Sequence, residues 1–308
     1  MSTELLITGG GGLLGSALKK LCPQAVFLTR QDGDLTDLYE VKRIFETLRP
    51  KYVLHLAAQV GGVKRNATEN ADLFAANVQI NTNVLNVAQQ LGVSRLVSVL
   101  SSCSFQFYAD RPSTEEDIHV GLPFRGNLGY GYAKRMLDIQ TKLLAEQYDC
   151  QFSTITPVSI YGPQDNWDLE EGHVIGSLIH KCFLAKQHHK ALEVWGSGEA
   201  VRQFVFAEDV ARVLLKALDS FNGPDTVIVA PDSGVKIAEL ARLIARVMKF
   251  DGSIVFNPAM PEGERIRVMQ SHRFSRHFPE FAFTSLEEGL SVTTEWFNRR
   301  RQNKMVEI

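Results

Sequence analysis

Three side chains from separate parts of the chain have the types needed to give a proton to a carbonyl oxygen. Tyr130 and Lys134 are four residues apart, so they share a face if both lie on one helix. A phenol has a pKa of about 10 and exchanges protons near neutral pH when a cation such as Lys134 lies beside it. Ser101 follows an apolar run and can hydrogen-bond the same carbonyl. The three residues predict reduction of a ketone, with a nicotinamide giving hydride to its carbon.

Tyr132 is a second candidate for the phenol because it lies on the same predicted helix. Its partner at the same spacing is Met136, which carries no charge. Tyr130 is therefore the preferred proton donor.

A glycine-rich turn near the start of the chain predicts a dinucleotide site. Residues 8–15 follow a strand-like run and open a helical pattern, so the backbone can turn sharply and approach a pyrophosphate at the helix N-terminus. Gly9, Gly12 and Gly15 fit the spacing GxxGxxG, whereas Gly10, Gly12 and Gly15 fit GxGxxG. The spacing leaves both patterns open. A flexible turn is the alternative, and the place between strand and helix favours the dinucleotide.

The residue type at the end of the second predicted strand indicates which dinucleotide is bound. Enzymes that use NAD usually carry an acid there to hold the ribose 2′-hydroxyl. This chain has Arg30 instead, whose forked donors and fixed charge suit a 2′-phosphate. Asp34 and Leu35 follow where a contact with adenine is expected. The sequence therefore predicts NADPH/NADP as cofactor, with an exposed surface arginine as the alternative.

Strand and helix patterns alternate through the first half of the chain. The predicted strands cover residues 5–7, 26–28, 52–54, 96–99 and 152–156, and the predicted helices cover 13–21, 39–48, 70–91 and 130–147. This alternation is typical of an α/β fold with a Rossmann-type, doubly wound parallel sheet. In such sheets ligands bind beyond the carboxyl ends of the strands. The glycine turn and Ser101 both follow strands, so the sheet is expected to bring them to one edge.

The rhythm changes after residue 163. Apolar runs are spaced less evenly there, over residues 173–186, 192–195, 208–218 and 237–248. We expect residues 1–163 to form the NADP-binding domain and residues 164–308 to form mainly a smaller, mostly helical substrate-binding region. Some later segments are expected to return to the sheet.

Composition excludes several classes of partner. The formal net charge of -2 gives no overall field for nucleic acid or an anionic membrane, and no apolar run approaches the ~20 residues of a membrane span. Residues 1–4 include an acid and precede a short strand, unlike a signal peptide. The four cysteines are far apart, so neither disulfides nor a zinc site are expected. His188 and His189 are predicted to lie in a surface loop, so no metal is expected, and the location is predicted to be cytoplasmic.

The chain resembles the extended short-chain dehydrogenases/reductases, and more narrowly the GDP-L-fucose synthase family. The resemblance covers nearly the whole chain. It is carried by residues 56–58, 60–62, 100–103, 129–136, 161–163, 165–166, 172–174, 194–198 and 202–204. The Ser-x-Cys and Gly-His-Val pieces are specific to the fucose synthase branch, whereas the others occur across nucleotide-sugar enzymes.

The resemblance implies NADPH-dependent 3,5-epimerisation and 4-keto reduction of GDP-4-keto-6-deoxy-D-mannose to GDP-L-fucose. It implies that Cys103 and His173 form the proton-transfer pair at C3 and C5. A thiolate and an imidazole both titrate near neutral pH, which suits protons next to a ketone. A buried structural thiol and a helix-end histidine are the alternatives. The family also implies a homodimer built through helices near residues 70–91 and 130–147.

The resemblance further implies the residues that bind the two ligands. The cofactor contacts are Gly9, Gly12, Leu13, Leu14, Gly15, Arg30, Asp34, Leu35, Leu56, Ala57, Ala58, Tyr130, Lys134 and His173. The substrate contacts are Ser102, Lys181, Trp195, Arg202 and Arg267, whose cations would neutralise the diphosphate of a GDP-linked keto-deoxy sugar. Exposed charges and a core tryptophan are the alternatives.

Two positions depart from the family pattern. Ser159 stands where many members have a substrate-contacting Asn, and Arg267 replaces a more usual Lys. The loop over residues 105–110 is also unusual. A related GDP-deoxy sugar of a colitose or 6-deoxy-heptose pathway therefore stays open as the substrate.

Other functions of the same fold fit less well. A 4,6-dehydratase would carry an Asp-Glu pair directly after the strand serines, where this chain has Cys103 and Ser104. A 4-epimerase has no use for the Cys103 and His173 pair. A non-catalytic NADP(H)-binding sensor would commonly lose Tyr130 or Lys134, and this chain keeps both.

Overall fold

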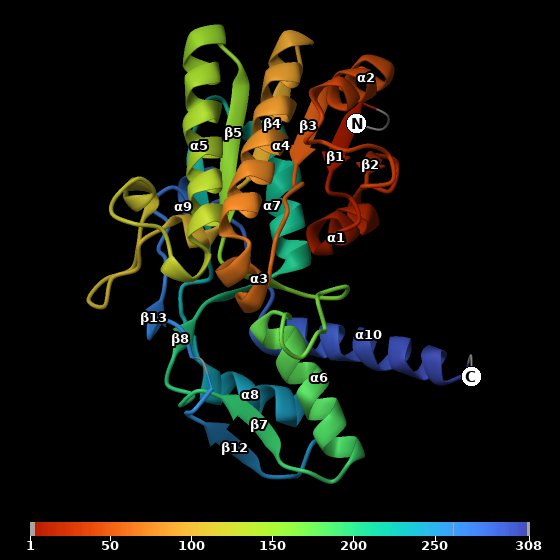
Figure 1. The fold of residues 1–308 in the computed structure, drawn as a ribbon, viewed down its shortest axis with the longest axis vertical. Coiled ribbons are helices and arrows are strands. Elements are labelled where there is room, and N and C mark those ends of the chain that lie inside the picture. Colours follow the sequence, from red (N-terminus) through yellow and green to blue (C-terminus); the bar gives the residue numbers. More distant parts are fainter. Residues whose placement is uncertain (1–3, 261, 307–308) are drawn as a thin grey trace.

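A six-stranded parallel sheet forms the larger part of the structure, a computed structural model that describes residues 4–260 and 262–306 (Figure 1). Its strands are β1 (Leu5–Thr8), β2 (Val26–Leu28), β3 (Tyr52–His55), β4 (Arg95–Val99), β5 (Gln151–Pro157) and β10 (Thr226–Val229). They are ordered β10-β5-β4-β3-β1-β2. The start of the chain, residues 1–3, on which the expectation about a signal peptide rests, lies outside the described residues.

Helices cover both faces of this sheet. They are α1 (Leu13–Leu21), α2 (Leu38–Leu48), α4 (Asn70–Gln90), α5 (Leu128–Tyr148) and α7 (Ala207–Ser220). The chain moves from β1 to β2 in one direction along the sheet and from β2 through β3, β4 and β5 in the other. Because crossovers are right-handed, α1 lies on one face, next to α7, and α2, α4 and α5 lie on the other. The prediction of a doubly wound α/β fold is confirmed.

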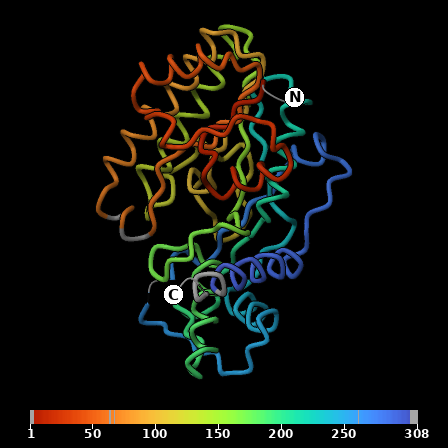
Figure 2. Tube along the Cα trace, turned by 90° about the vertical axis from the view of Figure 1, so that its right-hand side faces the viewer, coloured from red at the N-terminus to blue at the C-terminus, as the bar shows by residue number. Residues whose placement is uncertain are grey.

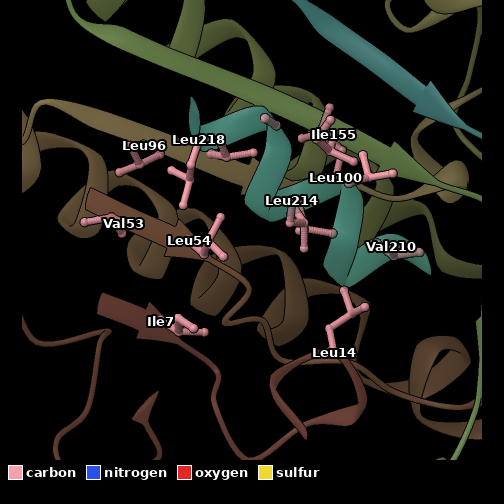
Figure 3. Packing of buried hydrophobic residues seen from close by; sticks show 14 of the residues in the cluster. Ile7, Leu14, Val53, Leu54, Leu96, Leu100, Ile155, Val210, Leu214 and Leu218 are labelled. Atoms are coloured by element: carbon pink, nitrogen blue, oxygen red, sulfur yellow. The ribbon is translucent and has the colours of Figure 1, made fainter. Parts of the chain in front are cut away.

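Burial on both faces explains why the strands are continuous apolar runs rather than alternating ones. Every residue of β1 is buried. On α7 the buried residues Val210, Leu214 and Leu218 recur every four positions and pack onto Leu54 and Ile155 of the sheet (Figure 3). The helix thus forms where its single apolar stripe meets the sheet.

The smaller part of the structure has its own apolar core. Its elements include α6 (Val174–Gln187), β7 (Leu192–Trp195), α8 (Ile237–Val247), β12 (Ile254–Asn257) and α10 (Leu286–Val306). Figure 2 shows the early segments, in red to yellow, in the upper half of the molecule together with some later segments, whereas the lower half consists of green and blue segments. Ile179, Leu192, Leu240 and Leu290 are fully buried in this second core.

The remaining elements are short. They are α3 (Val63–Thr68), β6 (Ser159–Tyr161), β8 (Val201–Arg202), β9 (Phe204–Phe206), β11 (Val235–Lys236), β13 (Ile266–Arg267), α9 (Phe274–His277) and three 3₁₀ turns (Ser102–Ser104, Glu115–Asp117, Arg125–Asn127). Strand β6 pairs with β9, and β8 pairs with β11 and β13. Segments after residue 163 return to the large sheet as α7 and β10. Within the described residues, every helix is too short or too polar to cross a membrane.

Asp138 fastens α5 to the edge of the sheet. Its carboxylate is buried and accepts hydrogen bonds from His119 Nε2 at 2.8 Å and from Lys142 Nζ at 2.7 Å. Its other oxygen accepts from the hydroxyls of Thr154 on β5, at 3.2 Å, and of Thr226 on β10. Burial alone would raise the pKa of Asp138, but these hydrogen bonds stabilise the carboxylate more strongly and lower the pKa to about 2. This one carboxylate therefore ties the helix to two strands.

We expect Asp138→Asn to lower the free energy of unfolding by about 3 kcal/mol, because it leaves His119 and Lys142 facing an uncharged group. The folded pKa of about 2 lies below the unfolded value of about 3.9, so the ion pair stabilises the fold above about pH 4. That contribution disappears as pH falls through about 2. Urea unfolding from pH 7 to pH 2 measures this. The exposed Asp219→Asn is the matched control; equal losses in both variants would contradict the assignment.

Candidate active site

A cavity of about 1310 Å³ lies where the carboxyl ends of β1, β3 and β4 face the smaller part of the structure. Nearly all the residues predicted from sequence to bind or react line it. They are Gly9, Gly12, Leu13, Leu14, Arg30, Asp34, Leu35, Leu56, Ala57, Ala58, Ser101, Ser102, Cys103, Tyr130, Lys134, His173, Lys181, Trp195, Arg202 and Arg267. Gly15 is the exception, because it is buried in α1 against Gly10 and does not line the cavity.

The glycine turn shows which of its residues the backbone requires. Gly9 has a φ of +73°, and a Cβ there would lie 2.8 Å from the Ala57 nitrogen. A Cβ on Gly15 would lie 2.4 Å from the Gly10 carbonyl oxygen, so α1 starts close to the turn only with glycine at this place. Gly12 is the N-cap of α1, and a Cβ there would meet no atom closer than the Gly9 carbonyl oxygen at 3.5 Å. A Cβ on Gly10 would likewise lie 2.7 Å from the Phe27 Cβ, so both spacings have a structural reason for their first glycine. Gly12 leaves room for a ligand.

The helix end above this turn suits an anion. The first turn of α1 carries no acidic residue, and Gly12 offers no side-chain cap to its N–H groups. The positive end of the helix dipole therefore faces the cavity without a competing negative side chain from that turn.

Arg30 lies exposed at the rim, just after β2. The Asp32 carboxylate accepts from Thr29 N at 2.7 Å and shapes the turn that carries Arg30. Asp34 accepts from the backbone and hydroxyl of Thr36, which lowers the pKa of Asp34 and engages it in its own turn. After β2 the cavity rim therefore offers the guanidinium of Arg30, whereas the nearby carboxylates of Asp32 and Asp34 are hydrogen-bonded within the turn. This arrangement fits the 2′-phosphate of NADP.

Lys134 lines the cavity, and a main-chain carbonyl of β4 holds its ammonium. Its ammonium is buried and donates to the Val99 carbonyl, the last residue of β4, at 2.7 Å. It lies 5.8 Å from the centre of the Tyr130 ring, one turn earlier on α5. Burial lowers the pKa of Lys134 to about 8, so it remains mainly charged at neutral pH.

The environment of Tyr130 favours a protonated phenol. Burial raises the pKa of its phenol, the charge of Cys103 adds to the rise, and a hydrogen bond with Ser101 only partly opposes it. The Lys134 ammonium is directed to the Val99 carbonyl, so its help in proton exchange by the phenol stays a prediction. Tyr130 is therefore protonated, the state from which it can donate.

Cys103 faces a cluster of donors. Asn127 Nδ2 donates to its Sγ at 2.9 Å, and an Arg267 nitrogen lies 3.4 Å from the same sulfur. The Cys103 backbone N–H donates to Ser101 Oγ at 3.2 Å. Burial would raise the pKa of the thiol, but the charge of Arg267 and these hydrogen bonds together lower it. The site therefore favours a thiolate.

His173 is oriented by a buried acid. It is the residue before α6, and its Nδ1 lies 2.8 Å from Oδ1 of Asp165, whose side chain is 1% exposed. The hydrogen bond and charge of Asp165 raise the pKa of His173 against the effect of burial, and the charge of Cys103 adds to the rise. The imidazole itself is 65% exposed into the cavity. His173 is thus favoured as an imidazolium that can reach a ligand.

Cations mark the far end of the cavity. Lys181 Nζ lies 3.9 Å from the centre of the Trp195 ring. Burial and the nearby charge of Arg267 together lower the pKa of Arg202 to about 10. Arg267 is sandwiched 4.9 Å from the Phe107 ring and 4.8 Å from the Phe124 ring. Glu262 also lines the cavity, and with Glu264 it partly offsets the charge of Arg202. The three cations could bind an anionic group of a ligand.

Sequence reasoning missed two residues of the site, Asp165 and Asn127. Asp165 belongs to a motif that carries the family resemblance, yet its contact with His173 depends on the loop that joins them. Asn127 had no signal beyond its place three residues before Tyr130.

Comparison with known proteins gives consistent matches. The NAD dependent epimerase/dehydratase family matches residues 5–230. GDP-L-fucose synthase from Dictyostelium discoideum is 34% identical over 302 residues, 95% of this chain and 94% of that protein. GDP-L-colitose synthase from Yersinia pseudotuberculosis is 29% identical, over 97% of this chain and 99% of that protein. The crystal structure of a GDP-L-fucose synthetase from Naegleria fowleri bound to NADP has a TM-score of 0.91 and 34% identity, covering 97% and 93%.

We expect Asp165→Asn to lower the pKa of His173, because the variant removes the negative charge that stabilises the imidazolium. The titration of its ring protons by NMR measures this, with His173→Gln identifying the resonance. Asp168→Asn, in the same loop but hydrogen-bonded to the backbone of Glu170 and Glu171, is the matched control. An unchanged titration of His173 in the Asp165 variant would contradict the pairing.

Proposed function

The chain belongs to the NAD dependent epimerase/dehydratase family, and from this membership we propose that it converts GDP-4-keto-6-deoxy-D-mannose to GDP-L-fucose with NADPH. The reaction combines epimerisation at C3 and C5 with reduction of the C4 ketone. The fucose synthases from Dictyostelium and Naegleria support this choice of reaction, and the NADP in the latter supports the cofactor.

The observation that carries the proposal is that one cavity holds two sets of proton-transfer groups. Tyr130, Lys134 and Ser101 form the set suited to a ketone oxygen, and Cys103 and His173 form the set suited to the neighbouring carbons. A simple 4-epimerase has no use for the second set, and a 4,6-dehydratase would carry an Asp-Glu pair where this chain has Cys103 and Ser104. A non-catalytic sensor has no use for either.

Epimerisation is assigned to the charges of Cys103 and His173. The thiolate takes a proton from the carbon next to the ketone, so the C–H bond breaks and an S–H bond forms. The electron pair moves onto the ketone oxygen as an enolate. The His173 imidazolium then returns a proton to that carbon from another wall of the cavity, which inverts its configuration. Asp165 keeps the imidazole oriented throughout.

Reduction is assigned to Tyr130. NADPH, when bound, supplies the hydride that C4 accepts. Gly9, Gly12 and Arg30 hold that cofactor at the glycine turn and the rim. Tyr130 gives its proton to the C4 oxygen as negative charge develops there, and the ammonium of Lys134 stabilises the phenolate that results. Ser101 hydrogen-bonds the same oxygen.

The nucleotide diphosphate is assigned to the far end of the cavity, where Lys181, Arg202 and Arg267 supply cations and Trp195 an aromatic face. We accordingly assign the cofactor mainly to residues 1–163 and the substrate mainly to residues 164–308. Ser159 also lines this cavity, at a position where the family usually has Asn. That difference favours, as a second candidate, a related GDP-deoxy sugar such as the one handled by the colitose synthase.

The compartment follows from the reactive thiol. All four cysteines are free, and Cys103 must stay reduced to act as a base. We therefore assign the enzyme to the cytoplasm.

A second copy of the chain is the proposed partner at the outer face of α5. Met136, Ile139 and Leu143 lie three and four residues apart and are 42%, 44% and 58% exposed. Ala71 and Ala75 are exposed on the adjacent α4, and such small residues let another helix approach. We propose a homodimer in which these helices pack against their copies.

We expect NADPH to be oxidised when GDP-4-keto-6-deoxymannose is added in D2O, with deuterium at C3 and C5 of GDP-L-fucose. Tyr130→Phe should lower reduction by at least about 100-fold and leave deuterium exchange largely intact, because only the proton donor for the C4 oxygen is lost. Mass spectrometry and NMR of the sugar measure both steps. Tyr132→Phe, a neighbouring phenol on α5, is the matched control. Loss of exchange together with reduction would contradict the division of roles, and a different product sugar would favour the second candidate.

The double variant Ile139→Glu, Leu143→Glu should sediment at the mass of one chain, because two carboxylates would be buried at the contact. The wild type and the control Val255→Glu, an exposed position on β12, should sediment at the mass of two. A monomeric wild type would rule out this dimer.

A further inference from the structure

Asn127 precedes α5 at the position where an asparagine normally caps a helix. Its side chain makes no capping hydrogen bond here. The N–H of Gly129, in the first turn of α5, is instead accepted by Asn70 Oδ1 at 2.7 Å, from the start of α4. The helix end is thus capped by another residue, which leaves the amide of Asn127 available for a different contact.

That contact is with Cys103. Asn127 Nδ2 donates to Cys103 Sγ at 2.9 Å, nearer than the Arg267 guanidinium at 3.4 Å. Asn127 Oδ1 is buried and has no hydrogen-bond partner within the described chain. An arrangement that leaves a buried acceptor unpaired does not serve stability alone. Asn127 also lines the cavity.

We propose that Asn127 is a positioning residue for the epimerisation, whose amide is released from capping by Asn70 and holds Cys103 as a thiolate aimed into the cavity. An N–H donor stabilises an anionic sulfur acceptor more than a neutral thiol.

The charged and titratable groups that face Cys103 come from three other places. Arg267 approaches from β13 and favours the thiolate. His173 comes from the start of α6 and senses the charge of Cys103. Tyr130 comes from α5, and the thiolate keeps its phenol protonated. Burial opposes the thiolate, and Arg267 and the hydrogen bonds that include that of Asn127 overcome it.

A neutral donor has an advantage that a cation lacks at this place. Arg267 belongs to the group of cations assigned to the diphosphate, so its charge is shared with the substrate once the substrate binds. The amide of Asn127 attracts a phosphate far less and keeps its donor on the sulfur. The thiolate can then persist in the loaded site, where it is needed.

The proposal rests on the assigned role of Cys103, but its test needs neither substrate nor cofactor. Iodoacetamide is reacted with the full chain over a range of pH, and mass spectrometry of the peptide that contains Cys103 gives the rate at that residue alone. The pH midpoint reports the thiolate, and the plateau at high pH reports access to the sulfur. The variants are Asn127→Ala, the isosteric Asn127→Asp and the cap control Asn70→Ala.

We expect both Asn127 variants to shift the midpoint upward and to slow alkylation at neutral pH by about tenfold, with Asp shifting more because it adds a negative charge. Asn70→Ala should weaken the start of α5 and leave the midpoint in place. If the Ala variant fails to fold, Asn127→Leu decides, because it is close in size to Asn and removes the donor without adding a charge.

The proposal is overturned if the Asn127 variants titrate with the wild type, if the wild type shows no lowered midpoint, or if Asn70→Ala shifts it as far as Asn127→Ala. A shift in the Asn127 variants without any solvent exchange at C3 or C5 in the wild-type enzyme would instead support the positioning of the thiolate and reject the proposed function.

Discussion

The buried contact between the Lys134 ammonium and the Val99 carbonyl fixes the geometry on which the site depends. Val99 is the last residue of β4, and Ser101 follows two residues later. The contact therefore fixes the position of α5 along the axis of β4, the strand that the serine follows. Tyr130 lies one turn before Lys134 and is brought to the same edge. A main-chain acceptor satisfies the charge without neutralising it, which an acidic side chain would do. Asp138, one turn further along α5, holds the next turn of the helix against β5 and β10 through its hydrogen bonds with Thr154 and Thr226.

The reactive charges come from different parts of the molecule. The Cys103 sulfur contacts groups at the end of β4 and the start of α5, whereas the His173 imidazole contacts Asp165 in the loop before α6. A proton can pass between opposite sides of one carbon only if both parts keep their relative placement. In the proposed mechanism, the pairing of short strands such as β6 and β9 would help to keep that placement. This explains why the cavity, rather than either part alone, is the functional unit.

The sequence was sufficient for the parts whose signal is local. Periodicity predicted the first five strands and the helices that cover them, because burial on both faces makes such strands continuous apolar runs. The sixth strand, β10, follows the change of rhythm in the sequence, so the periodicity does not predict its pairing with β5. Asp165 and Asn127 escaped because their roles depend on contacts between loops. The protonated state of Tyr130 escaped because spacing gives the distance of a cation but not the degree of burial.

The electrostatics of the cavity also impose an order on the proposed chemistry. The charge of Cys103 raises the pKa of Tyr130, so the phenol retains its proton while the thiolate is present. The same charge raises the pKa of His173, which favours the imidazolium. These shifts favour the anionic base and the two protonated acids with which the proposed epimerisation begins. When the thiolate takes up a proton, its repulsion on the phenolate is relieved, and loss of the Tyr130 proton becomes easier. The site thus couples proton uptake at the epimerising carbon to readiness for proton release at the ketone oxygen, which favours reduction after epimerisation.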